Sequence, residues 1–256
     1  MGRLVEPALV AAPHRRLAWQ VAKVVRVIPE TSRTKSLLLE VPDWPGHLAG
    51  QHIDVRLTAE DGYQAQRGYS ISSPPEDEHV AITVERLDDG EVSPYLTDEL
   101  DTGDELELRG PIGGYFTWQV SQGGPLLLVA GGSGVVPLMA MIRHRAATGA
   151  VVPTRLLYSS RTFEDIIYRD ELDRLAQDSG LEVFHTLTRA QPQGWTGYRR
   201  RIDRALLEEV AWPPQQRPHI FICGPTRLVE IAATTLTELG HDPARVKTER
   251  FGPTGG

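Results

Sequence analysis

The stretch "PLLLVAGGSGVVPLMAMIRHRAAT", residues 125–148, decides the fold class of the C-terminal half of the chain. Its first six residues are a continuous apolar run, which is typical of a strand buried on both faces. The residues from Val135 onward have helical spacing, and "GGSG" separates the two segments. The same alternation continues downstream, so the pattern predicts βαβ units and a parallel sheet. We expect further strands at 154–160, 181–189 and 219–224 and further helices at 163–180, 202–210 and 226–240.

The preceding part of the chain, from Trp19 to Arg109, has a different pattern of short apolar or alternating runs separated by Pro, Gly and Asp. The runs are at 19–28, 34–41, 52–59, 68–72 and 79–87. Strands at this spacing predict a small antiparallel barrel. One helix is expected at 93–100, with Ser93 as N-cap and Pro94 at its first position. We therefore expect an N-terminal tail, a barrel domain and an α/β domain, at 1–16, 17–120 and 121–256.

Composition limits the class of protein. A chain of 256 residues can form two ordinary domains, and its formal net charge of −7 gives no support for nucleic-acid binding. The single cysteine, Cys223, excludes an intrachain disulfide and an iron–sulfur cluster held wholly by this chain, which would need about four thiolates. No metal site is predicted. The most apolar window, 126–142, is interrupted by glycines and Pro137, and the N-terminus lacks a sustained apolar segment, so we expect a cytoplasmic protein with no membrane span.

The loop "VAGGSGVVP", residues 129–137, joins the first buried strand of the C-terminal half to its helix. Glycines let a backbone approach a ligand closely, and a helix N-terminus presents free N–H groups to a phosphate. The spacing departs from the full dinucleotide-binding pattern, because Pro137 stands where a third glycine would be. The next strand ends in "YSSR" rather than in an acidic residue that would bind a ribose hydroxyl. This loop alone is consistent with a phosphate site or with a simple tight turn.

The other strand ends add candidate ligand contacts. In an open α/β sheet, ligands bind beyond the carboxyl ends of the strands. Those ends carry Ser160–Arg161, Thr188–Arg189 and Cys223–Gly224–Pro225. Two arginines and a thiol among small residues suit an anionic, planar ligand. The alternatives are solvated loop charges for the arginines and a buried structural thiol for Cys223.

The stretch "RGYS", residues 67–70, places a cation beside an aromatic ring on one expected strand. Successive side chains of a strand face opposite ways, so Arg67 and Tyr69 share one face and Gly68 and Ser70 the other. Such a pair is either an ordinary surface contact or one edge of a site for an aromatic, phosphate-bearing cofactor. The residues themselves leave both interpretations open.

Taken together, the two halves resemble the ferredoxin–NADP⁺ reductase-like flavoenzymes over roughly residues 19–252. The resemblance implies a six-stranded antiparallel FAD-binding β-barrel followed by a parallel-sheet α/β domain that binds the nicotinamide dinucleotide. The motifs that carry it, in family order, are "RGYS", "GEVSPYL" at 90–96, "GPIGGYF" at 110–116, "GGSGVVP" at 131–137, "CGP" at 223–225 and "ERFGP" at 249–253.

On the flavin side, the resemblance implies that Arg67 meets the FAD pyrophosphate, Tyr69 packs against the isoalloxazine and Ser70 lies close to flavin N5. Guanidinium matches phosphate, a ring stacks on a ring, and a hydroxyl can hydrogen-bond the atom that takes the hydride. The backbone before the expected helix would add N–H donors to the same phosphates. The implied FAD-binding residues are Arg67, Gly68, Tyr69, Ser70, Gly90, Val92 and Ser93.

On the nicotinamide side, the resemblance implies that Phe251 covers the flavin until the nicotinamide displaces it; the alternative is a terminal hydrophobic plug. Cys223 and Glu249 would flank the hydride path and, with Ser70, form the catalytic group. The implied nicotinamide-side binding residues are Gly131, Gly132, Ser133, Gly134, Pro137, Ser160, Arg161, Arg189, Arg201, Cys223, Gly224, Pro225 and Phe251.

Cofactor choice is expected to favour NADPH, with NADH possible. Arg161, Arg189 and Arg201 resemble the basic positions that surround the 2′-phosphate in NADPH-using relatives. The stretch "WTGYRRRID" at 195–203 departs from the family pattern, because Arg200 replaces its second glycine.

The implied function is an FAD-dependent NAD(P)H oxidoreductase that passes a nicotinamide hydride to flavin N5 and then electrons to a separate redox protein of the ferredoxin, haem or molybdenum enzyme type. No ferredoxin or globin module flanks the core. The alternatives are a diaphorase or free-flavin reductase with a small-molecule acceptor, and a flavin-bearing regulatory subunit. The sequence leaves open the acceptor, the physiological direction and the oligomeric state.

Overall fold

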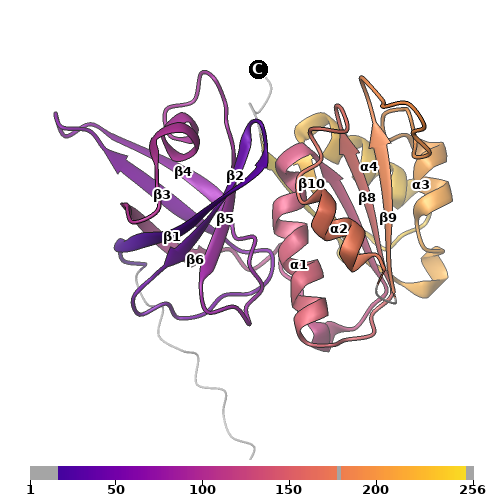
Figure 1. Cartoon of the computed structure of the whole chain (residues 1–256). Helices are drawn as coiled ribbons and strands as arrows, with labels where there is room; N and C mark the ends of the chain where they lie inside the picture. The colour runs from indigo at the N-terminus through magenta and orange to yellow at the C-terminus, as the bar shows by residue number, and fades with distance from the viewer. Residues whose placement is uncertain (1–16, 178–179, 252–256) are drawn as a thin grey trace, which may run out of the picture.

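Two β-sheets lie side by side in the computed structural model, which describes residues 17–177 and 180–251 (Figure 1). The expected N-terminal tail, 1–16, lies outside the described residues. The first sheet consists of β1 (Gln20–Thr31), β2 (Thr34–Glu40), β3 (His52–Thr58), β4 (Gln64–Ser70), β5 (Val80–Glu85) and β6 (Glu105–Ile112).

These six strands form an antiparallel barrel in the order β4-β3-β6-β1-β2-β5. The residues after β4 close it, since Ile71 bridges Ile82 and the Ser72 N–H donates to the Ala81 carbonyl at 2.7 Å. Apolar side chains from all six strands fill the interior. The expected six-stranded antiparallel barrel is confirmed, and its sixth strand, β6, comes from a segment for which the sequence analysis named no strand.

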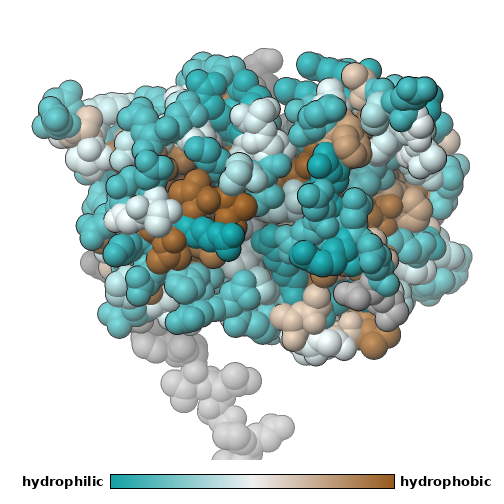
Figure 2. All heavy atoms as spheres, viewed as in Figure 1, coloured by the Kyte–Doolittle hydropathy of each residue, from teal (hydrophilic) through white to brown (hydrophobic). Residues whose placement is uncertain are grey.

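The expected helix at 93–100 is a short helical turn, η1 (Tyr95–Glu99), but the expected N-cap is wrong. The Ser93 hydroxyl accepts a hydrogen bond from the Leu87 N–H at 3.0 Å. The Leu96 N–H, which a capping side chain could have bound, already donates to the Val92 carbonyl. Ser93 therefore stabilises the loop before the turn. Figure 2 shows a mostly hydrophilic surface on this face, with a patch of apolar surface over the barrel below η1.

The second sheet is parallel throughout, in the order β11-β10-β7-β8-β9. Helices α1 and α2 pack on one face of it and α3 and α4 on the other, which confirms the expected α/β architecture. The sequence analysis missed its edge strand, β11. The elements are β7 (Leu126–Gly131), α1 (Val135–Ala147), β8 (Thr154–Ser160), α2 (Arg169–Leu175), β9 (Leu181–Leu187), α3 (Arg204–Val210), β10 (His219–Pro225), α4 (Thr226–Glu238) and β11 (Val246–Phe251).

Helix α2 is shorter than the expected helix at 163–180 because the residues before Arg169 form turns. Ile166, Ile167 and Tyr168 are all buried, and three consecutive side chains cannot lie on one buried face of a surface helix. Tyr168 takes a left-handed backbone conformation, with φ of 59°. Burial of this segment thus overrides its helical pattern. None of the helices in the described part of the chain is long and apolar enough to cross a membrane.

Helix α1 lies between the barrel and the parallel sheet (Figure 1), and polar side chains of this helix contact the barrel. Arg143 of α1 donates to the Ser72 carbonyl of the barrel at 2.7 Å and to Glu171 of α2 at 2.6 Å. His144, the next residue, has its Nδ1 atom 2.7 Å from a carboxylate oxygen of Glu76. Glu85, the last residue of β5, faces the carboxyl ends of β7 and β8, since it lines one cavity with Gly131 and Ser160.

Candidate functional site

A cavity of about 240 Å³ lies between the barrel and the carboxyl ends of the parallel strands. Its sheet wall includes six residues that the sequence analysis predicted to bind cofactor: Gly131, Gly132, Ser160, Arg161, Pro225 and Phe251. Its barrel wall consists of Thr31, Arg33, Thr34 and Glu85, none of which the sequence analysis predicted. The tertiary structure thus forms a two-walled cavity where the sequence analysis predicted only the sheet wall.

The glycines of the "GGSG" loop differ in what they do. A Cβ atom on Gly134 would lie 2.2 Å from the Cys223 carbonyl oxygen, so glycine there allows the loop after β7 to pack closely on β10. Gly132 has φ of 54°, and a Cβ atom there would meet only Glu85 Oε2, at 3.9 Å. Gly132 is therefore the glycine that borders open space. Ser133 is half-buried beside it, and Pro137 is buried in the first turn of α1.

Cys223 and Glu249 are direct neighbours in the register of β10 and β11. Cys223 is 2% exposed, and burial raises the pKa of its thiol well above the ordinary value. Burial also raises the pKa of Glu249 to about 7. Two register steps further, Phe251 pairs with Pro225 and lines the cavity, with 36% of its surface exposed. Cys223 and Glu249 do not line the cavity themselves; a neutral thiol and a carboxyl group that titrates near neutrality lie two residues before Pro225 and Phe251, which do.

Two buried oxygen atoms of this region, Ser160 Oγ and Glu249 Oε2, have no hydrogen-bond partner. Buried polar atoms in proteins are nearly always bonded, so such atoms mark a place where a ligand or water donates or accepts. In the described part of the chain, no three His, Cys or acidic side chains converge as metal ligands.

The three predicted 2′-phosphate arginines are exposed at the ends of β8 and β9 and in the loop after β9. The backbone N–H of Arg189 donates to the Arg161 carbonyl at 2.9 Å, which brings the first two together. Within residues 17–177 and 180–251, no carboxylate forms an ion pair with Arg161, Arg189 or Arg201. Arg200, by contrast, is paired with Asp203. Arg161, Arg189 and Arg201 are therefore free to bind an anion.

On the barrel, β4 carries the predicted flavin contacts. Arg67 pairs with Glu91, with 2.5 Å between Nη2 and Oε2. Tyr69 is half-buried against the barrel core, and burial raises the pKa of its hydroxyl to about 12. Gly68 and Ser70 lie on the other face of β4, where they pair with Asp54 and His52 of β3.

The loop "GEVS", residues 90–93, offers a ligand mainly its backbone. The Val92 side chain is fully buried in the barrel core. A Cβ atom on Gly90 would lie 2.8 Å from Ser93 Oγ, so glycine is needed there for the loop to close. The exposed side chain of the loop is Glu91, which the sequence analysis did not single out.

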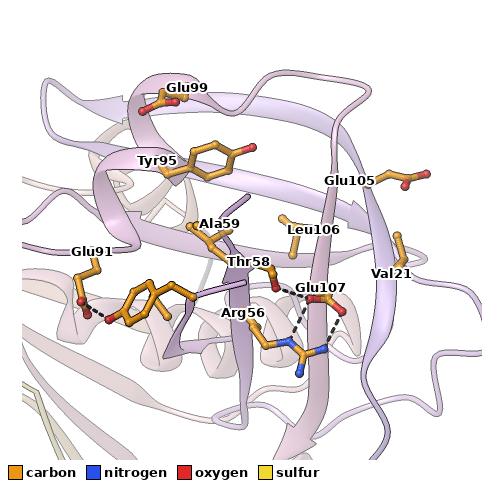
Figure 3. A pocket seen from close by; sticks show the side chains of 13 residues that line it. Val21, Arg56, Thr58, Ala59, Glu91, Tyr95, Glu99, Glu105, Leu106 and Glu107 are labelled. Carbon is orange, nitrogen blue, oxygen red and sulfur yellow. Dashed lines mark hydrogen bonds and ion pairs between the residues drawn. The ribbon is translucent and has the colours of Figure 1, made fainter. Parts of the chain in front are cut away.

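A second cavity, of about 620 Å³, lies at the end of the barrel beside this loop (Figure 3). Glu91, Glu99, Glu105 and Glu107 line it together with Tyr95 and other largely apolar groups. Arg56 neutralises Glu107 through two hydrogen bonds, of 2.7 and 3.0 Å (Figure 3). The cavity is therefore acidic and partly aromatic, and it adjoins Arg67 through Glu91.

Comparison with known proteins identifies the family. Residues 20–117 match the oxidoreductase FAD-binding domain and residues 128–234 the oxidoreductase NAD-binding domain. Ferredoxin–NADP reductase B of Sorangium cellulosum is 35% identical over 239 residues, which cover 90% of this chain and 96% of that protein. The chain belongs to the ferredoxin–NADP⁺ reductase-like family.

Other members of the ferredoxin–NADP⁺ reductase-like family are comparably similar. The glycine betaine monooxygenase reductase subunit of Pseudomonas aeruginosa is 34% identical over 239 residues, which cover 91% of this chain. The chain spans 64% of the length of that relative. The crystal structure of an Amycolatopsis cytochrome P450 reductase has a TM-score of 0.79 at 26% identity, and the match covers 93% of this chain and 71% of that one.

Family membership confirms several predictions made from the sequence. The chain is a member of a flavin- and nicotinamide-dependent oxidoreductase family, with FAD and a nicotinamide dinucleotide as the cofactors of its two domains. The relatives are named as the reductase subunit of a monooxygenase and as a ferredoxin–NADP reductase, and transfer of electrons to a separate partner belongs to the proposed function of this chain.

The residues on both sides fit these cofactors. Around Arg67, a guanidinium, a half-buried ring and a backbone loop match a pyrophosphate attached to a planar ring. At the carboxyl ends of the parallel strands, the unpaired Ser160 hydroxyl and the exposed Arg161 and Arg189 match a phosphorylated ribose. No sequence motif marked the barrel wall of the cavity between the domains, because Arg33 and Glu85 come close to Gly132 only through tertiary packing.

Proposed function

We propose that this chain takes a hydride from NADPH and passes electrons, one at a time, to a separate redox protein. The observation that carries the proposal is the pairing of the buried Cys223 with the half-buried Glu249, whose Oε2 atom has no hydrogen-bond partner, two residues before Pro225 and Phe251 in the wall of the cavity between the domains. When bound, FAD supplies the hydride-accepting and electron-transferring chemistry. The residues of the chain bind the two cofactors, orient them and exclude water.

On the flavin side, we assign phosphate binding to Arg67 and to the backbone N–H groups of residues 90–93. The half-buried ring of Tyr69 supports the flavin ring, and the Ser70 hydroxyl donates a hydrogen bond at its reactive edge. A charge-assisted bond from a guanidinium and a stacked ring are the two contacts that a phosphate-bearing aromatic cofactor needs.

On the nicotinamide side, we assign positioning of the reacting carbon to Cys223 and Glu249. A buried neutral thiol excludes water and sets the approach distance, while the adjacent carboxyl group can hold a proton near neutral pH. Phe251 is in position to cover the flavin until the nicotinamide replaces it. The N-terminus of α1, with Gly132 and Ser133, presents N–H groups to the dinucleotide phosphates.

NADPH is the proposed electron donor because Arg161, Arg189 and Arg201 are exposed and form no ion pair among the described residues, and Arg161 directly follows the buried Ser160. The test is kcat/KM for NADPH and NADH in the wild type and in Arg161→Ala. Exposed charge contacts suggest that the substitution lowers the NADPH preference by about two- to tenfold. Arg200→Ala, which removes an arginine already paired with Asp203, is the matched control. A wild type that prefers NADH would contradict the proposal.

A separate redox protein is the proposed electron acceptor of this chain. Two relatives support it, since one is named a monooxygenase reductase subunit and the other a cytochrome P450 reductase. Anaerobic stopped-flow spectroscopy tests this proposal. NADPH is first expected to bleach the flavin absorbance. The rate at which the reduced flavin is reoxidised is then measured with an iron–sulfur protein, a haem protein and free FMN. Faster reoxidation by FMN than by either protein would favour a diaphorase, and absence of bleaching a regulatory subunit.

Two further points belong to this proposal. We place the domain boundary near residue 120, between the last barrel strand and β7, and limited proteolysis that yields fragments cut near this residue would support it. We also propose a cytoplasmic location, which cell fractionation of the source organism tests.

A further inference from the structure

A carboxylate lies against the guanidinium to which we assign the FAD pyrophosphate. Oε2 of Glu91 is 2.5 Å from Nη2 of Arg67, and Oε1 of Glu91 accepts a hydrogen bond from the Tyr63 hydroxyl at 2.7 Å. Figure 3 shows Glu91 at the rim of the barrel-end cavity with its carboxylate in a hydrogen bond. Two donors on different segments, the strand β4 and the hairpin before it, therefore hold this carboxylate in place.

The carboxylate and a phosphate would compete for the same donors. The hydrogen bonds from Tyr63 and Arg67 lower the pKa of Glu91, so Glu91 is negatively charged at neutral pH. Arg67 already donates through Nη1 to the Gln66 carbonyl at 2.7 Å, which leaves the Nη2 side of its fork for an anion. Glu91 occupies that side. A phosphate that binds the Arg67 guanidinium must therefore compete with the Glu91 carboxylate for Nη2, and it is also repelled by the negative charge of that carboxylate.

We propose that Glu91 is an internal competitor of the flavin phosphates: its carboxylate binds the Arg67 fork and weakens FAD binding. The inference rests on the proposed role of Arg67. Tyr63 donates a second hydrogen bond to this carboxylate, so Glu91 keeps one partner when a phosphate replaces it on Arg67. The Arg67 and Glu91 side chains are about half exposed, at 53% and 47%, so solvent screens the competition and the effect on affinity is modest.

The test is FAD binding to flavin-free Glu91→Gln protein, followed by quenching of FAD fluorescence. Glutamine keeps the size of the side chain and removes its charge. We expect FAD to bind about two- to fivefold more tightly than to the wild type at low salt, with the gain shrinking at high salt. Glu91→Ala provides a second variant with the same expected direction.

Glu99→Gln is the matched control, because Glu99 lines the same cavity and no ion pair involving it is found among the residues that the structure describes. An equal gain in Glu99→Gln would overturn the proposal by showing a general charge effect. Weaker FAD binding in both Glu91 variants would also overturn it, because Glu91 would then orient Arg67. Arg67→Ala, titrated in parallel, separates the two proposals: unchanged FAD affinity there refutes the flavin site itself.

Discussion

The two cofactor regions of this reductase handle charge in opposite ways. Around β4 the charged groups are exposed and paired, as Arg67 is with Glu91. Near the cavity between the domains two buried polar atoms, Ser160 Oγ and Glu249 Oε2, lack partners, although Arg33 of the barrel wall is paired with Asp88. Exposed pairs exchange partners at little free-energy cost, which suits the binding of a phosphate. Buried groups change their proton affinity instead, which suits a site of reaction.

The largest expected effect is that of Glu249, near the cavity between the domains, on the free energy of unfolding. The pKa of Glu249 is about 7, against an ordinary value of 4.5, so the folded protein holds a proton in this pH range that the unfolded chain releases. Stability contributed by Glu249 is therefore lost as pH rises from 4.5 to 7. Glu249→Gln should become more stable than the wild type as pH rises, by up to about 3 kcal/mol.

Denaturant unfolding of both proteins between pH 5 and 8.5 measures this difference. Glu230→Gln, on exposed α4, is a control in which no comparable pH-dependent gain is expected. Wild-type and Glu249→Gln stability curves that run parallel through neutrality would show that Glu249 is not desolvated as the structure indicates.

The next largest expected effect is that of the exposed β4 region on the affinity for FAD. Arg67→Ala should bind FAD about ten- to a hundredfold more weakly, because a charged hydrogen bond contributes ~1.5–3 kcal/mol. Tyr69→Ala should also weaken binding, through loss of the stacked ring. Fluorescence titration of flavin-free protein measures both. Arg204→Ala removes an exposed, paired arginine of α3 and should leave the affinity unchanged. Wild-type affinity in both barrel variants would refute the flavin assignment.

A smaller effect is expected for the thiol. Cys223→Ala should slow flavin reduction by NADPH about tenfold while the dissociation constant of NADPH changes less, because a group beside the reacting carbon acts on geometry. Cys223→Ser, which keeps the size of the side chain, should retain more of the rate. Stopped-flow reduction over a range of NADPH concentrations separates the two constants. A reduction rate equal to that of the wild type would place the thiol outside the reaction site.

The smallest effect is expected at Phe251. Phe251→Ala should tighten nicotinamide binding about two- to fivefold, because no ring then competes for the stacking position. Phe251→Tyr keeps the ring and should bind as the wild type does. Titration with NADP⁺, followed by the flavin absorbance spectrum, measures both. Weaker binding in Phe251→Ala would favour the alternative of a terminal hydrophobic plug.

The sequence by itself determined the two architectures, because both depend on local periodicity. Alternating runs predicted the barrel strands, and the buried run at 125–130 predicted the first parallel strand. The same reasoning missed β11, whose charged residues hide its strand pattern, and extended α2 too far, because it could not know that Ile166 to Tyr168 are buried together.

Only the tertiary structure decided which side chains from distant segments meet. The sequence analysis named Arg67 and Glu249, but neither the pairing of Arg67 with Glu91 nor the burial of Glu249 beside Cys223 has a local signal. Both depend on strand order and on how the loops close. The barrel wall that brings Glu85 to Gly132 depends further on the docking of two domains. Periodicity reports the environment of a residue along its own element, whereas charge pairing and desolvation depend on neighbours that the chain brings close only by folding.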